Sequence, residues 1–253
     1  MRIPCKHPLN VRRTEIGGEQ PLVCVPLVAA HREALLDEAR EILSYTPDLL
    51  EWRADYLLGL APGDMLPLLA ELRVMIGETP LIFTYRSPAE GGRAPSDLAR
   101  RLEIVFAALS SPHADVVDFE LGSGEEAVSA VRREASKHSK RLLLSWHNFS
   151  STPGESFIIN KFVEAKELGA DIAKVAVMPA NSRDVLTLLS ATLAARLKTD
   201  IPLISMSMGS TGIVSRVFGG NFGSDVTFAQ GLSASAPGQI PVQGLRSIWR
   251  LLP

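Results

Sequence analysis

Eight short apolar runs alternate along the sequence with eight segments of helical pattern, and this order restricts the possible folds more than any other feature. We expect strands at 22–27, 49–55, 80–86, 115–121, 141–147, 171–177, 202–207 and 224–228. We expect helices at 33–39, from 64, after 97, at 125–137, 156–168 and 182–197, after 212, and through 245–251. Because a helix follows each strand, the strands should pair in parallel, and their continuous apolar runs indicate burial on both faces.

Eight such units in a chain of 253 residues predict a closed (β/α)8 barrel, a TIM barrel. We assign residues 21–253 to a single catalytic barrel domain and residues 1–20 to a short, hairpin-like N-terminal extension that turns at Gly17 and Gly18. An open, doubly wound sheet is the alternative. It is disfavoured because the first strand–helix turn, at 28–31, lacks the Gly-x-Gly-x-x-Gly pattern that holds a dinucleotide.

The composition excludes several kinds of partner. Nearly half of the residues (46%) are hydrophobic and the net charge is only -2, which argues against disorder and against nucleic acid binding. No apolar run approaches the ~20 residues that span a membrane, and the N-terminus lacks the apolar core of a signal peptide. We therefore expect a cytoplasmic protein without a membrane partner. Cys5 and Cys24 show no Cys-x-x-Cys spacing and indicate neither a disulfide nor a metal.

One predicted strand, 171–177, carries a lysine in its apolar centre, Lys174. Burying an ammonium group costs several kcal/mol unless it is paired or neutralised, so such a residue requires a reason. A desolvated amine exists more readily as the free base, which can attack a ketone to form an imine. The alternative is a lysine that extends along the strand to solvent.

Further polar side chains stand at the predicted ends of the strands or in the loops that follow. In a (β/α)8 barrel these positions converge on one mouth. The set has a cationic majority and does not resemble a metal cage, so we expect no metal and an anionic, oxygen-rich small molecule as guest. Its members are Glu51, Arg53, Arg86, Glu90, Glu120, His147, Lys174, Arg216, Ser235 and Gln239.

Several of these residues also have a structural explanation. Glu51 and Arg53 lie two apart on one strand and could form a salt bridge inside the barrel. Arg86 could lie at the surface, Glu120 is more often structural than catalytic, and Arg216 could occupy an exposed helix face.

His147 is the only one of the five histidines that ends a predicted strand; His7, His31, His113 and His138 fall in loops or helices. A histidine and a lysine on adjacent strands suggest imine chemistry with general acid–base catalysis. Elimination and aldol cleavage both remain open at this point.

Seven segments together resemble type I 3-dehydroquinate dehydratases, and they extend from the second strand to the last loop. They are EWRAD at 51–55, TYRSPAEGG at 84–92, SWHNF at 145–149, DIAK at 171–174, MGSTGIVSR at 208–216, FGS at 222–224 and SASAPGQ at 233–239. The resemblance implies a (β/α)8 hydro-lyase of the shikimate pathway, which leads to chorismate and the aromatic amino acids. Such an enzyme converts 3-dehydroquinate to 3-dehydroshikimate and water by syn elimination and needs no cofactor.

The resemblance also implies roles for individual residues. Lys174 would form the Schiff base with the substrate ketone, His147 would be the acid–base group, and Glu90 would orient His147. Arg216 and Gln239 would hold the carboxylate side of the substrate, and its hydroxyls would meet Glu51, Arg53, Arg86 and Ser235. The segment 233–239 would form a lid. Members of this family are often homodimers, so a homodimer is a possible assembly.

Two departures from the family pattern concern the site. Pro26 stands where some members have a serine that reaches the substrate, and Asn148 stands where an aspartate is common.

A class I aldolase or transaldolase remains an alternative, because residues 209–212 could hold a sugar phosphate. A non-catalytic protein that binds a carboxylate metabolite is a second alternative. The presence of both Lys174 and His147 argues against a simple binder.

Overall fold

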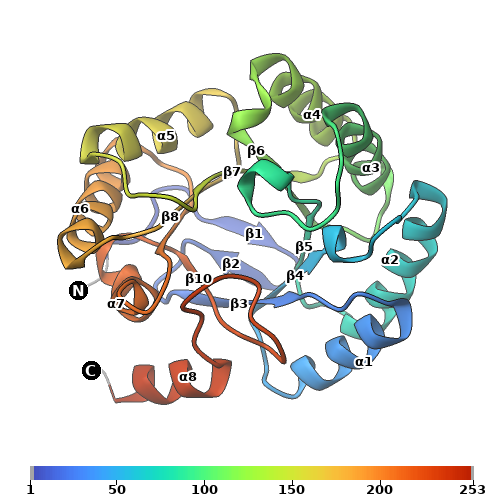
Figure 1. The fold of residues 1–253 in the computed structure, drawn as a ribbon, viewed down its shortest axis with the longest axis horizontal. Coiled ribbons are helices and arrows are strands. Elements are labelled where there is room, and N and C mark those ends of the chain that lie inside the picture. The colour runs from blue at the N-terminus through green and yellow to red at the C-terminus, as the bar shows by residue number, and fades with distance from the viewer. Residues whose placement is uncertain (1–2, 252–253) are drawn as a thin grey trace.

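The computed structural model describes residues 3–251, and its central sheet has eight parallel strands curled into a barrel with the helices outside it (Figure 1). The strand order is β10-β3-β4-β5-β6-β7-β8-β9. These strands are β3 Leu22–Leu27, β4 Leu49–Arg53, β5 Leu81–Thr84, β6 Val116–Glu120, β7 Arg141–Asn148, β8 Ile172–Val177, β9 Leu203–Ser207 and β10 Val226–Phe228. The predicted (β/α)8 fold is therefore confirmed.

The helices fill the connections between these strands. They are α1 Arg32–Leu43, α2 Pro62–Ile76, α3 Leu98–Ser110, α4 Glu125–Lys137, α5 Glu155–Glu167, α6 Ser182–Lys198, α7 Ile213–Phe218 and α8 Val242–Arg250. Local sequence explains several starting points. Asp97 caps α3 by accepting a hydrogen bond from Arg100 N at 2.8 Å, Asn181 caps α6, and α2 begins at Pro62.

The barrel closes between β9 and β10, where side chains replace part of the strand ladder. Asp225 N donates to Leu203 O at 2.6 Å, and Ser205 N donates to Ser224 Oγ at 3.0 Å. This use of Ser224 explains why β10 is shorter than the strand predicted at 224–228. The strand predicted at 80–86 is also shorter, because the chain leaves β5 after Thr84 and turns at Pro88.

An antiparallel hairpin of β1 (Leu9–Val11) and β2 (Thr14–Ile16) covers the N-terminal end of the barrel. Val11 and Ile16 pack on the apolar layer formed by the first inward residues of the strands. That layer contains Cys24, Leu49, Ile82, Val116, Leu143, Ile172, Ile204 and Val226. Because side chains alternate along a strand, the next inward positions lie two residues further on. Five of these are polar: Glu51, Thr84, Asp118, Ser145 and Lys174.

A four-fold pattern of aspartates holds the N-terminal end of the barrel together. An aspartate stands directly before every second strand and accepts a hydrogen bond from a backbone N–H near the start of the preceding strand. The four pairs are Asp48 with Val23 N (2.7 Å), Asp115 with Leu81 N (2.8 Å), Asp171 with Leu142 N (2.8 Å) and Asp225 with Leu203 N (2.6 Å).

Each of these aspartates also forms an ion pair with an arginine from a helix. Arg246 on α8 pairs with Asp48 at 3.3 Å, Arg73 on α2 with Asp115 at 2.6 Å, and Arg132 on α4 with Asp171 at 3.5 Å. The fourth pair joins Arg196 on α6 to Asp225. In every case the arginine comes from the helix that precedes the first strand of the pair around the ring. The barrel is therefore built from four equivalent quarters, each joined by one aspartate.

Candidate active site

A cavity opens at the C-terminal ends of the barrel strands, with an empty volume of about 420 Å³ including its mouth. Of the ten site residues predicted from the sequence, eight line it, and the two that do not are Glu120 and Arg216. The lining consists of Glu51, Arg53, Arg86, Glu90, His147, Phe149, Lys174, Ala176, Met206, Met208, Phe228, Ser235, Ala236 and Gln239. The strand-end positions therefore converge as the barrel requires.

Lys174 is buried in the floor of this cavity, with only 4% of its surface exposed. Its Nζ lies 3.2 Å from Asp118 Oδ2 and 3.6 Å from Glu51 Oε1, and 4.2 Å from the centre of the Phe228 ring. Thr84 Oγ1 donates to the same Glu51 oxygen at 2.9 Å. The lysine does not extend to solvent. Two carboxylates and an aromatic face compensate its charge inside the barrel.

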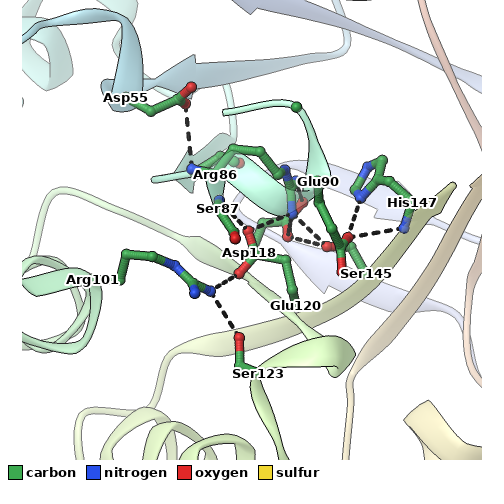
Figure 2. Close-up of polar contacts among 12 residues, drawn as sticks. Asp55, Arg86, Ser87, Glu90, Arg101, Asp118, Glu120, Ser123, Ser145 and His147 are labelled. Atoms are coloured by element: carbon green, nitrogen blue, oxygen red, sulfur yellow. Dashed lines mark hydrogen bonds and ion pairs between the residues drawn. The ribbon is translucent and has the colours of Figure 1, made fainter. Parts of the chain in front are cut away.

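Asp118 also binds Arg86 through both of its oxygens (Figure 2). Arg86 Nη1 donates to Oδ1 at 3.0 Å and Nη2 to Oδ2 at 2.6 Å, while Ser145 Oγ donates to Oδ1 at 2.6 Å. Burial by itself would raise the pKa of Asp118, but the charges of Arg86 and Lys174 outweigh burial and hold that pKa well below its ordinary value. Asp118 is therefore an ionised carboxylate between two cations.

Arg86 is held by further acceptors besides Asp118. Its Nη1 also contacts Glu120 Oε1 at 3.1 Å and Ser145 Oγ at 2.7 Å. Glu120 in turn accepts hydrogen bonds from Ser87 N at 2.8 Å and from Arg101 on α3. Figure 2 shows this connected set beside the Glu90–His147 pair. Most of the hydrogen-bonding capacity of the Arg86 guanidinium is thus used by the protein itself.

Glu90 and His147 form the second buried pair of the site. Glu90 Oε2 lies 2.8 Å from His147 Nδ1 and accepts from His147 N at 2.9 Å. Burial raises the pKa of Glu90 to about 7. Burial, together with the charges of Arg86 and Lys174, lowers the pKa of His147 well below its ordinary value. The imidazole is therefore neutral near pH 7, and when Nδ1 carries its proton, Nε2 is left as a base.

Arg216 is buried (2% exposed), so it does not occupy an exposed helix face, which its position in the sequence also allowed. Its Nη1 donates to Phe228 O at 3.1 Å and its Nη2 to Pro237 O at 3.0 Å, whereas its Nε has no hydrogen-bond partner. Burial lowers its pKa to about 10. No acidic side chain within residues 3–251 forms an ion pair with it. Arg216 is thus a buried cation without an anion.

The predicted lid, 233–239, folds back on itself. Ser235 N donates to Gln239 Oε1 at 2.8 Å, and Gln239 Nε2 donates to Ser235 Oγ at 3.0 Å. Pro237 O accepts from Gly209 N at 3.1 Å as well as from Arg216. The base of the lid is thereby joined to the loop after β9.

The two departures from the family pattern have simple structural settings. Pro26 is a buried residue of β3, in register with Glu51. Asn148 Oδ1 accepts from Ser150 N at 2.8 Å and from Ser151 N at 3.0 Å, so its side chain stabilises the turn after β7.

Three residues of the site, Asp118, Thr84 and Ser145, were not predicted from the sequence. The alternation of side chains along a strand could have revealed them, because each lies two residues before a recognised site residue: Glu120, Arg86 and His147. Phe228 carried no comparable signal, since an aromatic residue in an apolar strand is ordinarily core.

Within residues 3–251, no group of three or more His, Cys, Asp or Glu side chains is arranged to hold a metal ion. In the same range, no helix has both the length and the apolar character needed to cross a membrane.

A buried, carboxylate-paired lysine and a glutamate-paired histidine at the mouth of a parallel barrel form the candidate active site of a (β/α)8 enzyme. The sequence model described as Type I 3-dehydroquinase matches residues 23–253. The chain belongs to this family, as its sequence motifs predicted.

Individual relatives agree with this assignment over nearly the whole chain. The 3-dehydroquinate dehydratase of Geobacillus sp. (strain WCH70) is 42% identical, with 96% of this chain and 95% of the relative covered. The crystal structure of the Geobacillus kaustophilus 3-dehydroquinate dehydratase matches with a TM-score of 0.96 at 42% identity, covering 100% of this chain and 98% of that one. A Clostridium difficile type I 3-dehydroquinate dehydratase with covalently modified comenic acid matches with a TM-score of 0.93 at 35% identity, covering 98% of both chains.

Proposed function

We propose that this chain dehydrates 3-dehydroquinate to 3-dehydroshikimate through a Schiff base on Lys174, as a step of the shikimate pathway. The observation that carries the proposal is the presence of two different buried pairs in one cavity. Lys174 with Asp118 supplies an amine in a charged, dry setting, and His147 with Glu90 supplies a base. The curated relatives named above carry the name of this activity.

In the first step, His147 takes a proton from the Lys174 ammonium, and the free amine attacks the substrate ketone. The same proton is returned to the former ketone oxygen, which leaves as water while the protonated imine forms. The protonated imine is a cation in the place of the original ammonium, so Asp118 and Glu51 pair with a positive charge both before the attack and once the imine has formed. This arrangement stabilises the charged intermediate in a site that excludes most water.

In the second step, His147 removes a proton from the carbon next to the imine. Its Nδ1 is held by Glu90, and its Nε2 has the free electron pair. The imidazolium then returns that proton to the leaving hydroxyl, which departs as water, and hydrolysis of the imine releases the product. The net reaction is the loss of one water from the substrate.

We assign the substrate-binding roles from the side-chain groups whose hydrogen-bonding or charge partners within the protein are incomplete. Arg216 is a buried cation without an anion, which suits the substrate carboxylate; it contacts the lid at Pro237 O, and Gln239 of the same lid lines the cavity. We assign the substrate hydroxyls to Glu51, Arg53 and Ser235. Arg86 is occupied by Asp118, Glu120 and Ser145, so we propose that it mainly positions Asp118 and offers the substrate at most a shared N–H.

The alternatives from the sequence are less well supported. A sugar-phosphate aldolase was suggested by residues 209–212, but family membership favours the dehydratase. A non-catalytic binder would not need a base held beside a buried amine.

We also retain as proposals a cytoplasmic location, a homodimeric assembly, and the division into an extension at 1–20 and a barrel domain at 21–253.

A spectroscopic assay tests this function directly. The purified protein is mixed with 3-dehydroquinate, and the conjugated enone of 3-dehydroshikimate is followed by its absorbance. A rise that depends on the protein is expected. If neither product nor a covalent adduct formed, a binding protein would become the better interpretation.

A further inference from the structure

We infer that Asp55 is a positioning residue for this reaction: its carboxylate fixes the turn at 87–92 that carries Glu90, and through Glu90 it sets the orientation of His147. The inference rests on the proposed function, because it concerns how the acid–base pair of that function is held in place.

Asp55 is fully buried (0% exposed), and it does not line the cavity. It lies just beyond β4, in the short 3-10 helix Ala54–Tyr56. Its Oδ1 accepts from Arg53 Nε at 2.8 Å and from Arg86 N at 3.3 Å. Its Oδ2 accepts from Arg53 Nη2 at 2.9 Å and from Arg93 N at 3.0 Å. Four donors therefore converge on one carboxylate that cannot touch the substrate.

Two of these donors mark the beginning and the end of one turn. Arg86 N stands directly before residues 87–92 and Arg93 N directly after them, so the two Asp55 oxygens hold both ends (Figure 2 shows the contact with Arg86). A carboxylate in this position fixes the distance between the two ends of the turn and the direction in which the turn projects.

The turn itself has little internal freedom. Ser87 O accepts from Glu90 N at 2.9 Å and from Gly92 N at 2.8 Å. Gly91 has φ +85°, and a Cβ on Gly92 would lie 1.9 Å from Arg86 O, so neither position admits a side chain without strain. Because the turn is hydrogen-bonded within itself, its attachments to the barrel decide where Glu90 lies; these are the two contacts with Asp55 and the bond from Ser87 N to Glu120 Oε1 at 2.8 Å.

The position of Glu90 matters because one of its oxygens serves both His147 N and His147 Nδ1, at 2.9 and 2.8 Å. A displacement of the turn by about 1 Å would break at least one of these bonds, and misplacements of that size cost large factors in rate. The imidazole would then lose the contact that fixes its tautomer and the direction of Nε2.

Asp55 acts on Arg53 as well. The Arg53 guanidinium gives Nε and Nη2 to Asp55, and Nη2 also reaches Gly91 O at 3.4 Å. Within residues 3–251 its Nη1 makes no hydrogen bond, and the side chain lines the cavity. The carboxylate thus aims one N–H edge of Arg53 at the substrate. Loss of Asp55 should therefore affect binding through Arg53 and the proton transfer through Glu90.

Asp55→Asn tests the inference, because an amide keeps the shape but offers a donor where two N–H groups need an acceptor. We expect kcat to fall about ten- to a hundredfold and KM to rise, while borohydride still traps the substrate on Lys174. The pH profile of kcat, which depends on the Glu90–His147 pair, should change as well. A purely structural role would lower the melting temperature without moving this profile.

A double-mutant cycle with Glu90→Gln gives the sharper result, because coupled residues are not additive. If Asp55 acts on kcat through Glu90, Asp55→Asn should change the kcat of the Glu90→Gln variant by less than about twofold. Its effect on KM should persist there, since that effect runs through Arg53. If Asp55→Asn lowered kcat by its full factor in both backgrounds, the inference would be wrong.

Two further variants make the experiment decisive. Asp225→Asn alters an equally buried, arginine-paired aspartate at the opposite end of the barrel and should destabilise the fold with kcat retained. Should Asp55→Asn not fold, Pro88→Gly loosens the same turn at an exposed position and should lower kcat only when Glu90 is present. An unchanged kcat in Pro88→Gly would then overturn the inference. A wild-type protein without adduct and product would instead refute the proposed function itself.

Discussion

Asp118 Oδ2 is shared by two buried cations, lying 2.6 Å from Arg86 Nη2 and 3.2 Å from Lys174 Nζ. This shared oxygen joins Arg86, just beyond the end of β5, to the proposed nucleophile on β8, three strands further around the barrel. Since the oxygen is ionised, it allows a charged amine, and later a charged imine, to remain where little water reaches.

Asp118→Asn should therefore impair both stability and chemistry. Breaking a buried ion pair costs about 3 kcal/mol or more, because the remaining charges lose their compensation. We expect a lower free energy of unfolding in urea and at least about a tenfold slower formation of the trapped adduct. Ser145→Ala, which removes a neutral donor to the same carboxylate, is the matched control and should have a smaller effect on both measurements. Normal trapping by Asp118→Asn would remove the carboxylate from the imine step.

Asp115→Ala tests a structural aspartate for comparison with Asp118. Asp115 lies directly before β6, the strand that carries Asp118. Asp115 joins Arg73, Arg12 and Leu81 N in the four-fold pattern and lies far from the cavity lining. Its loss should lower the free energy of unfolding by about 3 kcal/mol, with kcat and KM unchanged in the folded protein. A large loss of kcat at a temperature where the variant is folded would contradict the view that this pattern is purely structural.

Glu90 should make the folding stability depend on pH. Burial raises its pKa from 4.5 to about 7, so the folded state binds this proton more tightly than the unfolded state. The stabilisation is complete below pH 4.5 and is lost as the pH rises through about 7, by at most about 3 kcal/mol.

Glu90→Gln removes this titration, and urea unfolding between pH 5 and pH 8 measures the effect. The variant should gain stability relative to the wild type as the pH rises. Replacing the exposed Glu126 on α4 by Gln should give a difference that does not vary with pH. A constant difference for Glu90→Gln would show that Glu90 is not protonated in the folded state.

Arg216→Met should weaken substrate binding, because it removes the buried cation assigned to the substrate carboxylate. Truncating one partner of a buried charge pair costs about 2 kcal/mol or more, which corresponds to roughly a thirtyfold rise in KM. A competitive inhibitor without a carboxylate should bind the variant and the wild type equally. If that inhibitor were weakened as much as the substrate, Arg216 would act through the lid contact with Pro237 instead.

The fold was predictable because its signal repeats along the chain. Eight apolar runs separated by helical segments admit few arrangements, and small errors at the ends of β4, β5 and β10 did not change the result. The predicted start of β10 was wrong for a local reason: Ser224 and Asp225 look like strand residues in sequence, but they close the barrel partly through their side chains.

The site was predictable only in part. Strand-end positions brought Glu51, Arg86, His147 and Lys174 to one cavity without any knowledge of distances. Which charge compensates which could not be read from the sequence, since that depends on the register between strands. The sequence analysis considered a salt bridge between Glu51 and Arg53, whereas Arg53 pairs with Asp55 and Glu51 lies near Lys174.

The most direct test of the central claim is borohydride reduction of the protein in the presence of 3-dehydroquinate, followed by mass spectrometry of the peptide that contains Lys174. We predict a substrate-derived mass on Lys174 in the wild type, and its absence in Lys174→Ala together with the loss of nearly all turnover. His147→Ala, the matched control, should form the adduct but release product about a hundredfold or more slowly. Product formation by the wild type with no adduct on Lys174, or turnover retained by Lys174→Ala, would contradict the account.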